Sequence, residues 1–326
     1  MTQPLLDVRN LTVSFHTPDG IVEAVRGVSF QVERGKTLGI VGESGSGKSV
    51  ATQTVAGLTR GARVSGQAIF EGRDLLALSA AELRAIRGPG IAMVFQNPLT
   101  SLHPFYRIGW QIAEMIRAHE AVTAEVARKR AIELLGLVGI PRPERRIDDY
   151  PHQFSGGMLQ RAMIAMALAL QPRLLIADEP TTALDVTVQA QIVRLMGRLQ
   201  REFGMAIILI THDLGVIAGS ADEVIVMYAG RVMEQASRHG LFGKPSHPYT
   251  EGLLGSLPQI DAAGQRLTAI AGQPPSLIQP PSGCPFHPRC PHVMDRCISE
   301  MPAFLAVPGA EEHHSACWLM DPEIPA

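Results

Sequence analysis

The sequence has no excess of charge of either sign. Its 29 Lys and Arg side chains nearly balance 31 Asp and Glu, so the formal net charge is -2. Without an overall basic field, we expect neither nucleic acid nor an anionic membrane surface as a partner. No basic segment followed by an apolar run opens the chain, and the longest apolar run, Ala162 to Leu170, covers about half a membrane span. These absences predict a soluble protein that is not exported.

Cysteine is missing from most of the chain. All four cysteines lie after residue 283, in a stretch from residue 236 onward that also holds 14 of the 24 prolines and 6 of the 11 histidines. This change of composition predicts a domain boundary there, with a main domain over 1–235 and a Pro/Cys-rich extension over 236–326. In a reducing compartment such cysteines are thiols or metal ligands rather than disulfides.

The main domain has the pattern of an α/β fold. Thr37 to Val41 predicts a buried strand, and a glycine-rich turn and a helix from Lys48 follow it. Continuous apolar runs at Leu174 to Ala177 and Ala206 to Ile210 are typical of strands covered on both faces, which predicts a parallel sheet. Before these two runs, over about residues 97–170, the apolar spacing is helical and predicts a helical insert.

Gly42 to Ser49 reads GESGSGKS and fits the pattern G-x-x-x-x-G-K-[ST] between a strand and a helix. Glycines let the backbone N–H groups of such a loop converge on phosphate oxygens, and the helix N-terminus adds its positive dipole end. Lys48 is expected to reach the β- and γ-phosphates, and the Ser49 hydroxyl to bind Mg²⁺.

Polar side chains follow three of the predicted strands. Asp178 and Glu179 come after Leu174 to Ala177, where Asp178 suits a Mg²⁺ shell and Glu179 could act as general base. Gln96 follows a strand over Ile91 to Phe95, and offers either a cation ligand or a polar strand end. His212 follows the third strand, where a lone histidine is often structural. An acidic pair after a strand can also be no more than a solvated loop.

Ser155, Gly156 and Gly157 precede a helix predicted over Met158 to Leu170. A serine and two unhindered amides at a helix start can bind a second anion. The alternative is an ordinary N-cap with a flexible lead-in.

Taken in order, these residues resemble the nucleotide-binding subunits of ABC transporters over about residues 5–235. The match comprises the aromatic A-loop, Walker A, Q-loop, signature, Walker B with its catalytic glutamate, D-loop and H-loop, at Phe15, Gly42, Ser44, Gly45, Ser46, Gly47, Lys48, Ser49, Gln96, Ser155, Gly156, Gly157, Asp178, Glu179, Asp185 and His212. The signature reads FSGGM here, where LSGGQ is the commoner family form.

The resemblance implies a RecA-like P-loop ATPase core with a β-rich N-terminal subdomain. It also implies a head-to-tail dimer in which ATP and Mg²⁺ on Walker A of one chain are closed by the signature of the other. Phe15 would stack on the adenine, Ser49, Gln96 and Asp178 would hold Mg²⁺, and His212 would contact the γ-phosphate.

A narrower resemblance points to the importer branch for oligopeptides, dipeptides and nickel. It rests on FQNPLTSLHP from Phe95, on HPYT from His247 and on GCPFHPRC from Gly283. It implies an ATPase at the cytoplasmic face of the membrane that drives two permease subunits, beside a second cassette and fed by an extracytoplasmic binding protein. Di- or oligopeptides are the expected solutes, with nickel or glutathione as alternatives.

A soluble ABC ATPase of translation or DNA repair is a competing interpretation. The chain has one cassette where soluble translation types usually have two, and only 106 residues lie between Lys48 and Ser155, which leaves no room for a long coiled coil. A nucleotide-binding regulator without turnover would be favoured by the loss of Glu179 or His212, and both are present.

The cysteines run C-x5-C-x6-C-x19-C, at Cys284, Cys290, Cys297 and Cys317. From spacing alone zinc, an iron-sulfur cluster and unligated thiols all remain open. The resemblance implies a [4Fe-4S] cluster on these four residues, with zinc as the alternative.

Aromatic residues make up only 5% of the chain, yet Phe105, Tyr106 and Trp110 cluster soon after Gln96. Such clusters are typical of interfaces, so we expect residues 98–106 to dock a membrane subunit, with core packing as the alternative.

Overall fold

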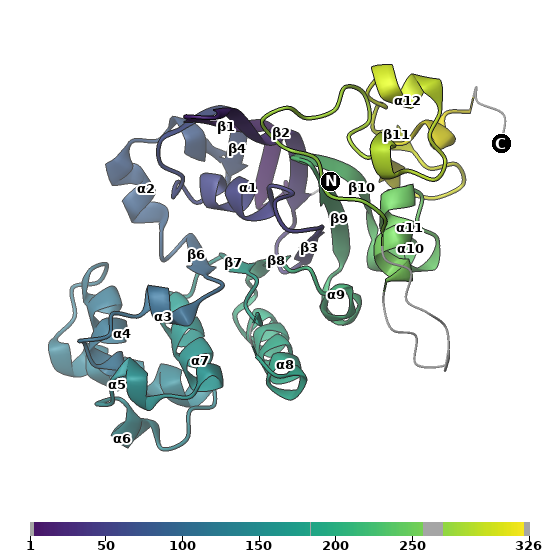
Figure 1. The fold of residues 1–326 in the computed structure, drawn as a ribbon. Helices are drawn as coiled ribbons and strands as arrows, with labels where there is room; N and C mark the ends of the chain where they lie inside the picture. The colour runs from purple at the N-terminus through teal and green to yellow at the C-terminus, as the bar shows by residue number, and fades with distance from the viewer. Residues whose placement is uncertain (1–2, 183, 257–269, 323–326) are drawn as a thin grey trace. The chain divides into compact units, whose positions relative to one another are not determined.

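The computed structural model describes residues 3–182, 184–256 and 270–322 (Figure 1). These residues fall into two compact units. The first unit lies within Met1–Val32, Thr37–Leu76 and Leu209–Ala326, and the second within Glu33–Lys36 and Ala77–Ile208. Residues on both sides of position 236 belong to the first unit, so the boundary predicted there from composition stays a prediction.

An antiparallel sheet forms the N-terminal part of the first unit. Its strands, in the order β2-β1-β4-β5, are β2 (Gly20–Val32), β1 (Leu6–Thr17), β4 (Ala62–Phe70) and β5 (Arg73–Asp74). Along β2, Val28, Phe30 and Val32 are buried while the residues between them are exposed. This period of two lets one face pack and the other meet solvent.

The first unit also holds a mixed sheet. Its order is β11-β12-β10-β9-β3, with β11 (Leu305–Ala306), β12 (His314–Ser315), β10 (Arg231–Ser237), β9 (Glu223–Tyr228) and β3 (Thr37–Val41). β3 and β9 pair in parallel, although no strand was predicted at the position of β9. β10 is antiparallel to β9, since only a tight turn at Ala229 and Gly230 joins them. The predicted parallel pairing therefore does not extend to this edge, where the C-terminal extension adds β12 and β11.

Short helices complete the first unit. They are α1 (Lys48–Val55), α9 (Leu214–Ser220), α10 (Arg238–Gly243), α11 (Pro248–Gly255), α12 (Asp295–Ser299) and the 3-10 turns η3 (His287–Arg289) and η4 (Trp318–Met320). A further turn, η1 (Leu75–Ala77), leads to the second unit.

The second unit combines buried strands with helices. β6 (Ile91–Val94) pairs in parallel with β7 (Leu174–Asp178), and β8 (Ala206–Ile210) lies on the other side of β7. The second unit ends at Ile208, within β8. The helices are α2 (Ala80–Ile86), α3 (Pro98–Ser101), α4 (Ile108–Arg117), α5 (Ala124–Leu137), α6 (Pro143–Arg146), η2 (Pro151–Gln153), α7 (Gly156–Ala167) and α8 (Val186–Phe203). All elements of residues 98–171 are helical, which confirms the predicted helical insert.

Local sequence sets the helix ends of this insert. In α4, Ile108, Ile112 and Ile116 are fully buried at helical spacing. Thr123 caps α5 by accepting a hydrogen bond from the Val126 N–H. α7 begins two residues before the predicted Met158, because Ser155 serves as its N-cap.

Candidate nucleotide-binding site

Three glycines of the phosphate loop have backbone conformations that favour glycine. Gly42, Gly45 and Gly47 have φ of 148°, 78° and 95°. A Cβ on Gly42 would lie 2.1 Å from the Met227 carbonyl oxygen, and one on Gly47 would lie 2.3 Å from that of Ala24. At these two positions the backbone of the first unit packs against the loop too closely for any side chain.

Lys48 begins α1 and turns back over the loop. Its Nζ donates to the carbonyl oxygens of Gly42 at 2.8 Å and Glu43 at 2.9 Å, and lies 3.4 Å from the Ser46 hydroxyl. The side chain is only 5% exposed. No side chain caps the start of α1, whose N-cap is Gly47. A buried ammonium beside uncapped helix amides is suited to binding an anion.

Glu43, the second residue of the loop, is held by residues that the sequence analysis did not single out. Its carboxylate pairs with Arg289, and its N–H donates to the hydroxyl of Tyr249. Arg289 and Tyr249 lie inside the HPYT and GCPFHPRC segments, which were noted only as marks of a family branch. Their separation from Glu43 by more than two hundred positions left no local signal for the contact.

In the second unit, Glu179 lies directly after β7 with φ of 47°, a left-handed conformation that is uncommon for a residue other than glycine. Its Oε2 accepts hydrogen bonds from the Gln96 amide at 2.8 Å and from the Thr182 hydroxyl at 2.9 Å. Asp178, the last residue of β7, is 5% exposed. Gln96 and Glu179, predicted as separate groups at strand ends, are thus brought into contact. The side-chain nitrogen of Gln96 makes this bond, so its side-chain oxygen is the atom suited to bind a cation.

The Ser155-Gly156-Gly157 segment forms the start of α7. The Ser155 hydroxyl accepts from the Met158 N–H at 3.4 Å, so the N-cap interpretation holds. Both glycines are the first helical residues, and a Cβ on Gly157 would lie 2.9 Å from a methyl of Val188 on α8. Ser155 and Gly156 are exposed at this helix start, which leaves the anion-binding interpretation open beside the cap.

The remaining predicted residues are placed on defined elements. Phe15 is half-buried on β1, opposite Val22 and Ala62. His212 is exposed in the turn after β8, and Asp185 caps α8 by accepting from the Val188 N–H at 2.9 Å. The first unit therefore carries the A-loop, phosphate-loop and H-loop residues, and the second carries those of the Q-loop, signature, Walker B and D-loop.

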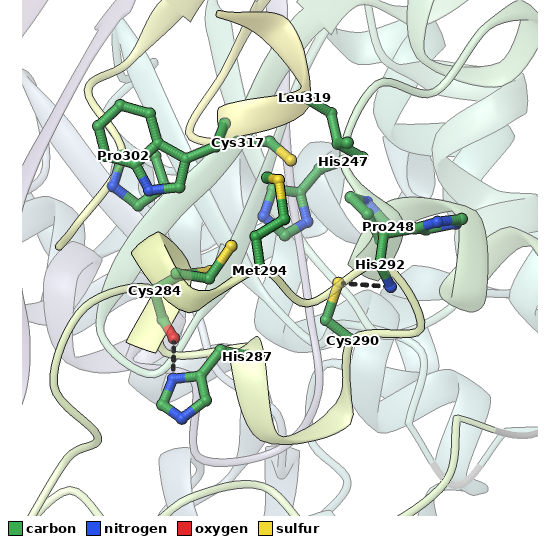
Figure 2. A pocket seen from close by; sticks show the side chains of 12 residues that line it. His247, Pro248, Cys284, His287, Cys290, His292, Met294, Pro302, Cys317 and Leu319 are labelled. Atoms are coloured by element: carbon green, nitrogen blue, oxygen red, sulfur yellow. Dashed lines mark hydrogen bonds between the residues drawn. The ribbon is translucent and has the colours of Figure 1, made fainter. Parts of the chain in front are cut away.

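The four cysteines line one pocket of the first unit (Figure 2). All four are free thiols. Burial, with a smaller effect of the neighbouring cysteines, raises the pKa of Cys284 to about 11 and that of Cys317 to about 12. Among the described residues, no three His, Cys, Asp or Glu side chains gather closely enough to hold a metal ion.

The ring of His247 lines the same pocket. It is 1% exposed, and its Nδ1 accepts from the Tyr249 N–H at 3.0 Å, which caps α11. Burial lowers its pKa to about 3. His247 is therefore neutral and carries its proton on Nε2, and the ring interacts with the Ala316 backbone without a hydrogen bond of normal geometry.

The aromatic cluster of the helical insert is on the surface. Phe105 is 81% exposed, Trp110 is 48% exposed, and the ring centroids of Tyr106 and Trp110 lie 4.3 Å apart. Leu99 on α3 is a further exposed apolar side chain, at 60%. Core packing, the alternative for this cluster, is wrong for Phe105. In the described part of the chain, no helix is both long and apolar enough to cross a membrane.

Two family models match the sequence. Residues 25–182 match "ABC transporter", and residues 233–297 match "Oligopeptide/dipeptide transporter, C-terminal region". The oligopeptide transport ATP-binding protein OppD of Bacillus subtilis (strain 168) is 50% identical over 98% of this chain and 90% of its own length. The dipeptide transport ATP-binding protein DppD of the same strain is 51% identical over 98% and 96%.

A solved structure has a similar fold. It is a dimeric, post-hydrolysis state of the ATP-binding cassette MJ0796 bound to ADP and Pi, with a TM-score of 0.65 and 29% identity. The similarity covers 72% of this chain and 98% of that one. These matches agree with the family resemblance seen in the motifs and with the P-loop core.

Proposed function

Because the chain belongs to the ABC transporter family, in the group of oligopeptide and dipeptide transport ATP-binding proteins, we propose that it hydrolyses ATP to energise the import of di- and oligopeptides. The observation that best supports turnover is the state of Glu179. Its left-handed backbone is sparsely populated, and its carboxylate is fixed by Gln96 and Thr182. A strained, oriented carboxylate after a buried strand suits a general base for water.

The proposed roles divide between nucleotide binding and chemistry. The backbone of Gly42 to Ser49 binds the phosphates, Lys48 contacts the β- and γ-phosphates, and Phe15 stacks on adenine. Ser49, Gln96 and Asp178 would hold Mg²⁺, which would shield the phosphate charge. His212 contacts the γ-phosphate, while Ser155 to Gly157 and Asp185 act toward the second cassette of a dimer.

Glu179→Gln tests this assignment. In the reconstituted transporter, we expect ATP hydrolysis to fall by about 10²-fold or more while ATP binding is retained, because the amide cannot take a proton from water. Lys48→Ala should weaken nucleotide binding itself, since a direct phosphate contact is lost. Near-normal hydrolysis by Glu179→Gln would remove Glu179 from this role.

The proposed partners are two membrane-spanning permease subunits and a second ABC cassette, with an extracytoplasmic binding protein acting through the permeases. With these partners, the chain would lie at the cytoplasmic face of the membrane. The exposed cluster of Leu99, Phe105, Tyr106 and Trp110 supports a docking surface for a permease, because aromatic side chains are enriched in interfaces and rarely so exposed without a partner.

We also propose that Cys284, Cys290, Cys297 and Cys317 bind a [4Fe-4S] cluster. The donor chemistry fits, since four thiols from separated segments line one pocket. Zinc on the same four thiols is the alternative. The cluster would tie the segments together or sense redox state.

A further inference from the structure

An arginine of the C-terminal extension contacts the phosphate loop. The guanidinium of Arg289 makes a two-pronged pair with the Glu43 carboxylate, with Nη1 2.6 Å from Oε2 and Nη2 3.0 Å from Oε1. The Arg289 side chain is 5% exposed and that of Glu43 is 26% exposed. Paired, partly buried charges of this geometry are strong and directional, so they fix position as well as adding energy.

Further contacts hold Arg289 itself in place. Its Nε donates to the Ala271 carbonyl oxygen at 2.9 Å, its Nη2 to that of Ile270 at 3.3 Å, and its Nη1 to the Tyr228 hydroxyl at 3.1 Å. Hydrogen bonding to Glu43 is the first cause of a raised Arg289 pKa. The guanidinium is therefore a rigid, permanently charged contact.

Glu43 connects this contact to Lys48. Its N–H donates to the Tyr249 hydroxyl at 2.8 Å, and its carbonyl oxygen accepts from the Lys48 Nζ at 2.9 Å. The side chain, N–H and carbonyl of one loop residue thus bond to Arg289, Tyr249 and Lys48 respectively. Displacing the Glu43 carboxylate would move a carbonyl that orients the lysine ammonium.

From this chain of contacts we propose that Arg289 is a positioning residue for nucleotide binding, which acts through Glu43 on the phosphate loop. The proposal rests on the proposed ATP-binding function. It makes the C-terminal extension part of the machinery that sets ATP affinity. Because the contacts of Arg289 lead through Glu43 to the phosphate loop, its loss should weaken binding and leave the chemical step largely unchanged.

The test uses the assembled transporter and a matched set of variants. Arg289→Gln and Glu43→Gln each remove one side of the pair, and Arg296→Gln is the control. Arg296 pairs with Glu300 and Asp321 in the same extension. ATP affinity is measured with a fluorescent nucleotide, and KM and kcat for ATP by phosphate release.

We expect Arg289→Gln and Glu43→Gln each to raise Kd and KM for ATP about tenfold, with kcat changed less than about threefold. The double variant should add little to either single one, because both remove the same contact. Arg289→Lys should restore part of the affinity, and Arg296→Gln should match the wild type.

Unchanged Kd and KM in both single variants would overturn the proposal, as would additive effects in the double variant. If Arg289→Gln does not fold, Glu43→Gln alone decides, since it leaves the other contacts of Arg289 in place. A wild-type protein that binds no ATP would overturn the proposed function, and this inference with it. If the wild-type protein binds and hydrolyses ATP and the variants have the same Kd and KM, only this inference is overturned.

Discussion

His247 shows how a single buried side chain makes stability depend on pH. In the folded protein its pKa is about 3, because burial disfavours the charged ring. Its Nδ1 lone pair accepts the Tyr249 N–H and would be lost on protonation. The unfolded chain takes up a proton below about pH 6.5 while the folded chain does not. Acid therefore favours unfolding.

This sign gives a measurable prediction. On lowering the pH from about 7.5 to about 5.5, His247 should remove about 1.4 kcal/mol from the free energy of unfolding. His247→Asn can still cap α11 but does not titrate, so the pH dependence of its unfolding should be smaller by about that amount. Urea denaturation of both proteins at the two pH values makes the comparison. If the free energy of unfolding depends on pH equally in both proteins, the pKa of His247 is not lowered in the folded protein.

At the scale of elements, the local apolar pattern predicted the positions of several buried strands and helices correctly. β3 and β8 have the predicted bounds, because uninterrupted apolar runs are buried on both faces whatever their neighbours. α4 and α5 both lie within the stretch that was predicted to be helical. The short strands β11 and β12 were missed, since two-residue strands have no periodicity and depend on the edge that β10 presents.

The site was predicted unevenly for the same reason. Motif spacing identified the loop and the strand-end carboxylates, whose positions follow from the chain around them. The contact between Arg289 and Glu43 joins residues 246 positions apart, so it exists only after the fold brings them together. The left-handed backbone at Glu179 was equally invisible, because no glycine or asparagine marks it.

Two glycines of the phosphate loop provide a matched test of its packing. Gly45 and Gly47 both have positive φ, but a Cβ on Gly45 would meet nothing within 4 Å, whereas one on Gly47 would lie 2.3 Å from the Ala24 carbonyl oxygen. Gly45→Ala should lower the free energy of unfolding by about 1 kcal/mol, through backbone strain alone. Gly47→Ala should lower it by about 3 kcal/mol or more, because a steric clash is added. Thermal unfolding without nucleotide measures both. Equal losses would mean that Gly47 is not packed against β2.

The exposed segment before α4 yields a prediction about coupling. Phe105→Ser removes a large apolar side chain that is 81% exposed and should leave the fold unchanged. It should weaken assembly with the permease subunits by about tenfold, if this side chain is an interface anchor. Val186→Ser, at an 82% exposed position on α8, is the matched control. Co-purification of the permeases with each variant decides; equal recovery would remove Phe105 from the interface.

For the whole molecule, the C-terminal extension is an integral part of the first unit. β12 pairs with β10, and the buried Glu234 carboxylate accepts from the N–H groups of Ser246 and His247 and pairs with His313. The extension also buries aromatic side chains such as Phe286. Its fold thus draws on packing and hydrogen bonds across distant parts of the sequence, and a cluster would add to these rather than replace them.

Thiol reactivity alone cannot show whether a cluster is bound. A thiol with a pKa near 11 has about a hundredfold less thiolate at neutral pH than one with a pKa of 9.0, which is the value from which burial raises Cys284. Cys284 and Cys317 should therefore resist alkylation with or without metal. Ligation has to be read from the metal content.

The protein purified without oxygen should accordingly be brown and contain about four iron and four sulfide per chain. Cys297→Ser should lower this content, because it removes one thiolate ligand, while Met294→Leu in the same pocket should leave it unchanged. ATP hydrolysis by folded Cys297→Ser should be largely retained, since the phosphate chemistry is assigned to other residues. One zinc per chain without iron would contradict the cluster and keep the ligands; no metal at all would contradict both.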